Sequence, residues 1–467
     1  MRELDIVVVG AGIGGLGSAL ALARAGHHVT LVERDDSPMP DNVEDAFEWD
    51  RRGAPQVRHP HVFLGLAQTI LRDHFPDVFQ TLSDLGVEPA PLGEQDRARL
   101  DEATIAVITA DRDLRMLPCR RTTFEWVMRR AVLAQPGVEL RLGHGVSGLE
   151  LDHDADGRPC VTGVTLEDGT TLPADVAVVT TGRRSDLPAW LAAHGVEITE
   201  TESDAGVVYF SRFYRSDHDE GFGFRASLAA GIGAGVIGSD AGTYSVTAVV
   251  DRADKELRAH LSDSDRFDAT IRLMPDLDDV TAAAGEPIHP VHWMTGLVNR
   301  TRSFTDDQGE PLVVGLLACG DAHTCTNPAY GRGQALALRQ AVQLTDVLGD
   351  CTDLVAAGRA YEALAEETVV PWYHFSVLTD AMRAAAVARS GWEAGQDGFE
   401  LGGLFDRDNP DPEIVRTVMR VFNLLELPSA LIELMANAQA AAAERPARPR
   451  EPRPKGPTRD DLLSVLA

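Results

Sequence analysis

The sequence contains few lysines and few cysteines, and both shortages exclude certain kinds of site. Lys255 and Lys455 are the only lysines among 467 residues, so arginine carries almost all of the positive charge. The five cysteines form no CxxC pair and match no zinc-site spacing, so we expect no metal site. A sparse, odd set of cysteines in a long chain is typical of reduced thiols, which indicates a cytoplasmic protein.

The sequence also lacks a long hydrophobic run and an excess of basic charge. No uncharged apolar run reaches the roughly 18 residues that a membrane span requires. The first apolar run has neither the basic region nor the small-residue cleavage site of a signal peptide. With 72 acidic against 43 basic residues, the formal net charge is −29. Such a charge repels phosphate backbones and anionic lipids, so we expect neither nucleic-acid nor membrane binding.

The first 33 residues have the pattern of a βαβ unit. Residues 4–9 are apolar and β-branched, as in a buried parallel strand. Residues 14–25 are rich in Ala and Leu and predict a helix that Gly26 ends, and residues 28–33 predict a second strand. The N-terminal part is therefore expected to be a Rossmann-type α/β domain.

The segment Gly10-Ala-Gly12-Ile-Gly-Gly15 lies between the first strand and the helix. Gly10 permits a tight turn, Gly12 lets the backbone approach a pyrophosphate, and Gly15 lets helix and strand pack closely. The helix N-terminus offers free N–H groups and partial positive charge to the phosphates. Glu33 ends the second strand, where its carboxylate can accept hydrogen bonds from a ribose hydroxyl. These features predict a dinucleotide site, and a Rossmann-like fold without nucleotide is the alternative.

A second motif, later in the chain, favours FAD over NAD. Residues 313–318 predict a buried strand that leads to Gly320-Asp321, and after a loop with Asn327-Pro328 the segment Gly331-Arg332-Gly333 opens a helix. A carboxylate at the strand end can hold ribityl hydroxyls. The helix N-terminus can stabilise the negative charge that develops on a flavin pyrimidine during reduction. Together, the two motifs predict an FAD domain assembled from distant segments.

On these motifs the sequence resembles the FAD-dependent monooxygenases related to para-hydroxybenzoate hydroxylase, over roughly residues 1–385. Within that group it looks most similar to the actinobacterial branch with the flavin epoxidases of polyether antibiotic biosynthesis. The stretch Gln56-Val-Arg58-His59-Pro-His61 is typical of this branch. The resemblance implies tightly bound FAD, O₂ as co-substrate and a flavin C4a-hydroperoxide. The substrate would be a small, mostly apolar specialised metabolite that is epoxidised or hydroxylated.

The resemblance also assigns cofactor contacts. Glycines 10, 12 and 15 would bind the ADP half with Glu33 and the adjacent Arg34, and Arg121 matches the family arginine that reaches the ribose and pyrophosphate. Val146 lies in the strand whose backbone usually meets the adenine. Asp321 would bind the ribityl chain, and residues 331–333 would face the isoalloxazine. The full set expected to bind the cofactor is Gly10, Gly12, Gly15, Glu33, Arg34, Arg121, Val146, Gly320, Asp321, Gly331, Arg332 and Gly333.

Two departures from related patterns bear on the chemistry. The family's internal Asp-Gly motif, tied to FAD and NAD(P)H binding, is here Thr180-Thr181-Gly182. The missing acid argues against stable docking of NAD(P)H, so the electron source is either NAD(P)H or a separate flavin reductase as partner. Flavin-dependent halogenases share the architecture but need a tunnel lysine and a Trp-x-Trp-x-Ile-Pro segment. That segment is absent, and Lys255 and Lys455 lie far from the required position.

The residues that we expect to take part in catalysis are His61, Arg212, Asn327 and Pro328. Arg212 lies in residues 206–214, which predict either a strand with one solvated face or a wall of the substrate cavity. In the second case Arg212 would lie near the flavin or an acidic substrate group. His59 and His61 are either loop histidines bonded to the backbone or members of the active site. Asn327 and Pro328 belong to the loop before the flavin-facing helix.

The expected fold is α/β, with a discontinuous FAD-binding domain, an inserted β-sheet substrate domain and a C-terminal helical region. The expected bounds are 1–75, 100–190 and 296–350 for the FAD domain, 76–99 and 191–295 for the substrate domain, 351–439 for the helical region, 440–458 for a disordered linker and 459–467 for a short tail. Removing the linker and tail should leave fold and flavin intact. The expected activity is that of a flavin-dependent monooxygenase. The alternatives are an FAD-dependent dehydrogenase or alkene reductase and a non-catalytic escort protein.

Overall fold

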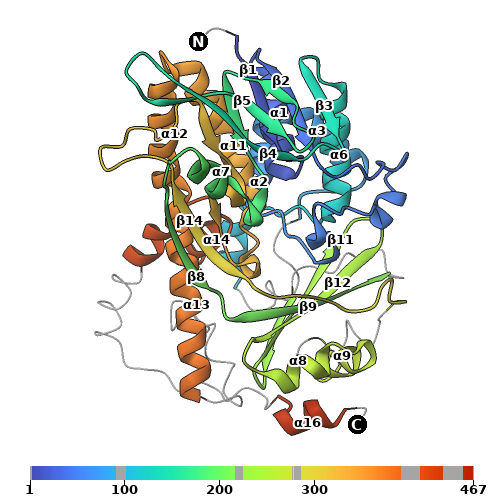
Figure 1. Ribbon diagram of the computed structural model, residues 1–467. Coiled ribbons are helices and arrows are strands. Elements are labelled where there is room, and N and C mark those ends of the chain that lie inside the picture. Colours follow the sequence, from blue (N-terminus) through green and yellow to red (C-terminus); the bar gives the residue numbers. More distant parts are fainter. Residues whose placement is uncertain are drawn as a thin grey trace.

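The computed structural model describes residues 3–90, 101–215, 225–275, 277, 285–390, 411–434 and 456–465. Its centre is a parallel five-stranded sheet with the strand order β3–β2–β1–β7–β15 (Figure 1). The strands are β1 (Asp5–Val9), β2 (His28–Glu33), β3 (Val138–Leu142), β7 (Val176–Val179) and β15 (Leu316–Ala318). Every neighbouring pair is parallel, which confirms the Rossmann-type α/β prediction.

The parallel sheet is buried on both faces, because alternate side chains of each strand enter different cores. In β1, Ile6 and Val8 pack among the helices, whereas Val7 and Val9 pack against an antiparallel meander. The meander consists of β4 (Val146–His153), β5 (Pro159–Leu166) and β6 (Thr171–Pro173). Strands β3 and β7, which precede and follow the meander in the chain, join the parallel sheet instead.

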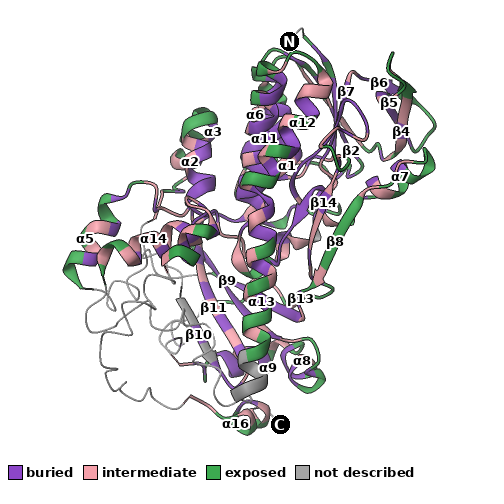
Figure 2. Cartoon of the chain, turned by 90° about the vertical axis from the view of Figure 1, so that its left-hand side faces the viewer, coloured by how far each residue is buried: buried purple, intermediate pink, exposed green. Residues whose placement is uncertain are grey.

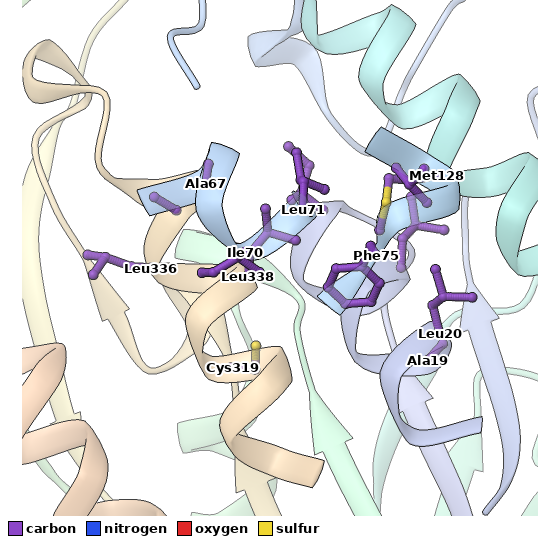
Figure 3. Close-up of a cluster of buried hydrophobic side chains, with 14 of the residues drawn as sticks. Ala19, Leu20, Ala67, Ile70, Leu71, Phe75, Met128, Cys319, Leu336 and Leu338 are labelled. Carbon is purple, nitrogen blue, oxygen red and sulfur yellow. The ribbon is translucent and has the colours of Figure 1, made fainter. Parts of the chain in front are cut away.

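Helices cover the other face of the sheet. They are α1 (Ile13–Arg24), α2 (Gly65–His74), α3 (Pro76–Asp84), α6 (Arg121–Ala134) and α11 (Gly333–Asp350). Their apolar side chains form one large core, and Figure 3 shows part of it, with Ala19 and Leu20 of α1, Ile70 and Leu71 of α2, Met128 of α6, and Leu336 and Leu338 of α11. Helix α1 begins just after β1, and the first residue of α11 lies beside Asp321, just after β15, so both N-termini lie at the carboxyl edge of the sheet.

The strand expected over residues 313–318 is shorter in the structure. Gly315 has a φ of +82°, so the extended backbone is interrupted before β15 begins at Leu316. A Cβ at this position would lie 2.6 Å from the carbonyl oxygen of Asp175. The turn therefore requires glycine, and it separates Val313 and Val314 from the parallel sheet.

A second sheet, antiparallel, has the order β10–β11–β12–β9–β13. Its strands are β9 (Val207–Arg215), β10 (Arg225–Ala229), β11 (Ile232–Ser239), β12 (Thr243–Asp251) and β13 (His292–Met294). One face packs on α8 (Lys255–Leu261) and α9 (Ser264–Ile271), through a core that includes Phe210 and Phe267. The other face is turned toward the parallel-sheet domain (Figure 1).

A third sheet connects the parallel-sheet domain to the antiparallel-sheet body, which is the antiparallel sheet with α8 and α9. It has the order β16–β14–β8, with β8 (Thr199–Asp204), β14 (Val298–Ser303) and β16 (Thr324–Cys325). Further helices of the described residues are α5 (Glu102–Ala110), α7 (Leu187–Ala193), α12 (Leu354–Thr368), α13 (Val370–Ser390), α14 (Pro412–Phe422) and α16 (Arg459–Ser464). Their 3₁₀ turns are η1 (Asp45–Glu48), η2 (Pro55–Arg58), η3 (Gly182–Arg184), η4 (Gly320–Ala322) and η5 (Pro328–Tyr330). Helix α13 runs down beside the antiparallel sheet, with one side of it exposed (Figure 2).

The C-terminal helix α16 is docked on the antiparallel-sheet body. Leu462 is fully buried in the core beneath α8 and α9, and Arg459 makes two hydrogen bonds to the carboxylate of Asp254, at 2.6 and 2.9 Å. The expected linker, 440–458, lies mainly outside the described residues. Because α16 contributes to a core, we no longer expect its removal to be neutral.

Three absences concern the described part of the chain. All five cysteines are free thiols. Within the described residues, no cluster of His, Cys, Asp and Glu side chains is placed to hold a metal ion. None of the helices formed by these residues combines the length and the apolar character that a membrane crossing needs.

Candidate active site

The carboxyl edge of the parallel sheet brings distant motifs together. Gly10 follows β1, Glu33 ends β2, Thr180 follows β7, and Asp321 lies just after β15. In open α/β sheets, ligands bind outside the carboxyl ends of the strands, where the strand order reverses. The edge between β1 and β7 is such a point here, since β2 and β3 lie on one side of β1 and β7 and β15 on the other.

The glycine motif has the shape that a pyrophosphate requires. Gly10 has a φ of +100°, and a Cβ at Gly15 would lie 1.8 Å from the Gly10 carbonyl oxygen, so α1 packs against the turn only with glycine there. Gly12 is the N-cap of α1, no side chain caps this helix end, and a Cβ on Gly12 would meet nothing within 4 Å. Open space therefore lies in front of uncapped N–H groups, as phosphate binding needs.

Glu33 is 7% exposed and organises the loop around it. Its Oε2 accepts a hydrogen bond from the Ala11 backbone N–H at 2.8 Å, and its Oε1 accepts one from the Asp35 N–H at 2.9 Å. Each carboxylate oxygen keeps a further lone pair for a ribose hydroxyl. Glu33 thus combines a structural role in the glycine turn with the predicted ribose contact. The adjacent Arg34 is exposed, and Val146 lies half-buried at the start of β4.

Asp321 is a carboxylate in an environment that disfavours its charge. Burial raises its pKa, and the positive charges of Arg121 and Arg183 oppose this shift. One carboxylate oxygen lies 3.5 Å from the position of a Cβ on Gly333, the first residue of α11. A ligand with several hydroxyl donors would satisfy this carboxylate, so the site suits the ribityl chain of FAD.

Arg121 belongs to a buried cluster of charges. Its Nε donates to Glu125 Oε1 at 2.7 Å, and Glu125 Oε2 accepts a second hydrogen bond from Arg51. The Arg121 Nη1 lies 3.3 Å from His61 Nε2, and His61 Nδ1 lies 2.9 Å from the His59 carbonyl oxygen. Both ring nitrogens of His61 are therefore engaged within the protein, and burial together with Arg121 lowers its pKa well below the usual value. The geometry favours a role in placing Arg121.

The loop before α11 is held by its own side chains. Asn327 Oδ1 accepts from the Tyr209 hydroxyl at 2.8 Å and from the Ala329 N–H at 3.1 Å, and Asn327 Nδ2 donates to Asp380 at 2.8 Å. The amide of Asn327 is thus committed to holding the loop, while Pro328 is exposed. Gly331 has a φ of +65°, which turns the chain into α11.

Arg332 points away from the expected cofactor. It is 1% exposed and lies against the rings of Tyr330, Trp372 and Phe375, and its Nη1 donates to Ser376 Oγ at 2.5 Å. Burial lowers its pKa to about 10. The side chain therefore anchors the loop to α13, and any contact of Arg332 with the cofactor would come from its backbone.

Arg212 is not in the cavity wall, and this expectation is corrected. Its guanidinium bonds to Asp268 of α9 at 2.7 Å and to the His289 carbonyl oxygen at 2.8 Å. Because side chains alternate along β9, the face turned to the parallel-sheet domain carries Tyr209, Ser211 and Phe213 instead. By the same alternation, Val208 and Phe210 pack on α8 and α9 and do not line that wall.

The face of β9 that carries Ser211 and Phe213 contacts side chains from the parallel-sheet domain. Ser211 Oγ lies 3.0 Å from His59 Nδ1, and Phe213 packs edge-on against Phe47, with ring centroids 5.4 Å apart. Phe47 in turn stacks on His289 at 5.1 Å. Burial, together with His292 and Arg183, lowers the pKa of His59 to about 4, so this ring is neutral at pH 7. A largely aromatic wall results, with the guanidinium of Arg120 over the Phe47 ring and that of Arg58 beside His289.

The structure adds site residues that sequence reasoning missed. Arg51, Glu125 and Arg183 lie among the charges at the carboxyl edge, and Asp380 lies behind the loop before α11. Arg121 and Glu125 are four residues apart, a spacing at which side chains meet on a helix, and this spacing could have indicated their pairing. No sequence signal connects Asp380 to Asn327.

Comparisons with known proteins agree with this geometry. The family "FAD dependent oxidoreductase" matches residues 5–40. The chain is 26% identical over 457 residues to protein Rv3254 of Mycobacterium tuberculosis, covering 90% of this chain and 89% of that protein. It is 26% identical over 395 residues to the FAD-dependent monooxygenase dmxR9 of Cryptosporiopsis sp., covering 78% and 70% of the two chains.

Among solved structures, the chain is similar to HpxO of Klebsiella pneumoniae complexed with FAD and uric acid. The TM-score is 0.57 at 16% identity, and the alignment covers 94% of this chain and 97% of that chain. This likeness shows a shared fold. Together, the fold and the matching segment at residues 5–40 confirm the prediction of an FAD-dependent oxidoreductase.

Proposed function

We propose that the protein is a flavin-dependent monooxygenase that epoxidises or hydroxylates a mostly apolar small molecule. The observation that carries the proposal is the meeting of the two motifs at one sheet edge, opposite the neutral, aromatic face of β9. When bound, FAD supplies the activation of O₂ and the transfer of one oxygen atom. The monooxygenase name of the relative dmxR9 and the resemblance to polyether epoxidases support this choice over a dehydrogenase.

The chain's own residues would bind FAD, orient its ring system and shield the reaction from water. The uncapped N-terminus of α1 and Arg121 would hold the pyrophosphate, and Asp321 would hold the ribityl hydroxyls. The N-terminus of α11 would favour negative charge on the pyrimidine side of the ring system. Tyr209 and Phe213 are 5% and 4% exposed, and such a wall favours an apolar ligand and limits the entry of water.

One experiment separates the proposal from its alternatives. The purified protein is reduced without oxygen and then mixed rapidly with O₂, with and without candidate olefins and arenes, while flavin absorbance and products are followed. A transient absorbance that differs from oxidised and reduced flavin, with one oxygen atom in the product, is expected. Turnover without O₂ uptake would identify a dehydrogenase or alkene reductase, and colourless protein would identify an escort protein.

A further inference from the structure

A buried carboxylate lies behind the loop that precedes α11. Asp380, on α13, is 5% exposed and accepts three side-chain hydrogen bonds. Its Oδ1 accepts from Asn327 Nδ2 and from the Tyr330 hydroxyl, each at 2.8 Å, and its Oδ2 accepts from Asn299 Nδ2 at 2.8 Å. The Nη2 of Arg383 lies farther away, 3.9 Å from Oδ1.

The same side chains connect four separate elements. Asn299 of β14 uses its Oδ1 to accept the backbone N–H of Asn327 at 2.7 Å, and Tyr209 of β9 donates to Asn327 Oδ1. Asn299 and Asn327 are 0% and 1% exposed. Each side-chain nitrogen and oxygen of Asn299 and Asn327 therefore has at least one hydrogen-bond partner, and Asn327 Oδ1 has two. In a buried network of this kind, the loss of one acceptor leaves donors unsatisfied and frees the segment that they held.

We infer that Asp380 is a positioning residue that fixes the loop from Asn327 to Gly333 for the flavin reaction. This inference rests on the proposed function, since only a bound flavin makes the place of this loop matter. Asp380 is remote in sequence from both cofactor motifs, and its helix lies outside the FAD domain. A carboxylate suits this place because it offers two oxygens to three donors, whereas an amide offers one.

Asp380 also lines an open cavity of about 510 Å³ between α13 and the turns after β8 and β12. Small side chains, such as Ala381 and Ala384, leave room beside the carboxylate. A small anion can therefore reach the position of Asp380 from solvent. This access allows a chemical test of whether the carboxylate itself matters.

The test is a residue swap. Asp380→Asn removes one acceptor oxygen and places an amide donor against the Asn299 donor. When Asp380→Asn is combined with Asn299→Asp, the amide at position 380 donates to the carboxylate at position 299, so one donor again faces one acceptor, and the carboxylate at position 299 still accepts the Asn327 N–H. Asp251→Asn, which removes another carboxylate from the same cavity, is the matched control. The readouts are amide hydrogen exchange of residues 326–331 in flavin-free protein, the visible spectrum of bound FAD, and the ratio of product to O₂ consumed.

Asp380→Asn should raise the exchange rate of this segment about tenfold or more, as expected for the loss of a buried hydrogen bond to a charged group. It should also alter the flavin spectrum and lower the ratio of product to O₂ consumed. In the double variant, the exchange rate, the flavin spectrum and the ratio of product to O₂ consumed should return to the wild-type values. Added formate should partly restore these three quantities in Asp380→Ala. Unchanged exchange and spectrum in Asp380→Asn, or a double variant no better than the single one, would overturn the inference. Failure of the proposed function is separate, because wild-type protein would then bind no FAD or transfer no oxygen.

Discussion

Arg121 and Glu125 lie one turn apart on α6, and the Arg121 Nε donates a 2.7 Å hydrogen bond to Glu125 Oε1. The other carboxylate oxygen accepts from Arg51, so one fully buried acid holds two cations of the carboxyl edge. Its pKa stays below the usual value because the three neighbouring arginines outweigh the effect of burial. The placement of the arginine that would meet the pyrophosphate thus depends on a residue that touches no cofactor.

We expect Glu125→Gln to weaken FAD binding. The neutral amide cannot accept from both arginines, so Arg121 loses its defined position, and the dissociation constant should rise about tenfold or more, in line with about 1.5–3 kcal/mol for a charged hydrogen bond. Fluorescence titration of flavin-free protein measures it. Asp154→Asn, which removes the acid of the more exposed pair with Arg158, should leave the affinity unchanged. Equal affinity in Glu125→Gln would show that Arg121 does not need its partner.

Gly12→Leu should give folded, colourless protein. Nothing lies within 4 Å of a Cβ on Gly12, so the fold tolerates the side chain, which instead occupies the space of the pyrophosphate. Circular dichroism checks the fold and the absorbance spectrum checks the flavin. Gly148→Leu, at another glycine with open space around it, serves as the control. Full flavin retention in Gly12→Leu would refute the pyrophosphate site.

Asp321→Ala should weaken FAD binding more than Glu33→Ala does. Asp321 is expected to hold ribityl hydroxyls with charge-assisted bonds worth about 1.5–3 kcal/mol. The Glu33 carboxylate accepts hydrogen bonds from the backbone N–H groups of Ala11 and Asp35, so Glu33→Ala should chiefly lower the melting temperature. Measuring both dissociation constants and melting temperatures separates these effects, and the opposite ranking in affinity would count against the ribityl assignment.

The same residue predicts a pH effect in the flavin-free protein. Burial raises the pKa of Asp321 above its ordinary 3.8, so the folded state holds the proton more firmly than the unfolded state. Its contribution to stability is therefore present below pH 3.8 and is lost as pH rises through the raised pKa. Asp321→Asn should reduce this loss and raise the melting temperature at pH 7, while binding FAD less tightly. A lower melting temperature at pH 7 would contradict the prediction.

Removal of residues 456–467 should destabilise the antiparallel-sheet body. Leu462 is fully buried, and Leu→Ala changes in such positions cost about 2–5 kcal/mol. Leu462→Ala should therefore lower the melting temperature, whereas Ser464→Ala, at an exposed position of the same helix, should not. Differential scanning calorimetry of the truncated and substituted proteins measures the effect. Identical melting curves would show that α16 is not docked in solution.

Reduction of the bound flavin by NAD(P)H alone is expected to be slow. The acid of the family motif is replaced by Thr181, whose hydroxyl donates to Ser185 Oγ at 2.6 Å and offers no charge to a nicotinamide cofactor. Stopped-flow absorbance with NADH and NADPH, with and without a flavin reductase, measures the rates. Rapid, saturable reduction by either nucleotide alone would refute this expectation and leave the oxygenase proposal unaffected.

Local pattern was enough to predict the elements that carry the cofactor site. The predicted strand 28–33 coincides with β2, and the predicted helix 14–25 differs from α1 by one residue at each end, because the apolar pattern and the ends of both elements are encoded in neighbouring residues. The two glycine motifs imply a parallel sheet, and in such a sheet the residues that end or follow the strands lie at one edge. The meeting of Gly10, Glu33 and Asp321 could therefore be predicted.

The errors arose where a residue's direction or partner is set by tertiary packing. Strand β9 is apolar on both faces and eight of its nine residues are buried, so no alternation of polarity shows which way Arg212 points. The role of Asp380 depends on α13 lying against β14 and the loop before α11, which no local pattern contains. The docking of α16 likewise depends on tertiary partners, through the burial of Leu462 and the hydrogen bonds of Arg459 to Asp254, in a segment of polar composition.

Because of the position of α16, fluorescence energy transfer can follow the distance between the antiparallel sheet and the flavin site. The helix lies under α8 and α9, at the end of the molecule far from β1, whereas flavin would sit at the carboxyl edge of the parallel sheet (Figure 1). A dye attached at Val465 would therefore move with the antiparallel sheet, and the fluorescence of the flavin would report on the other body. Energy transfer between them would register any hinge motion around β8 and β14 during substrate entry, without a second label.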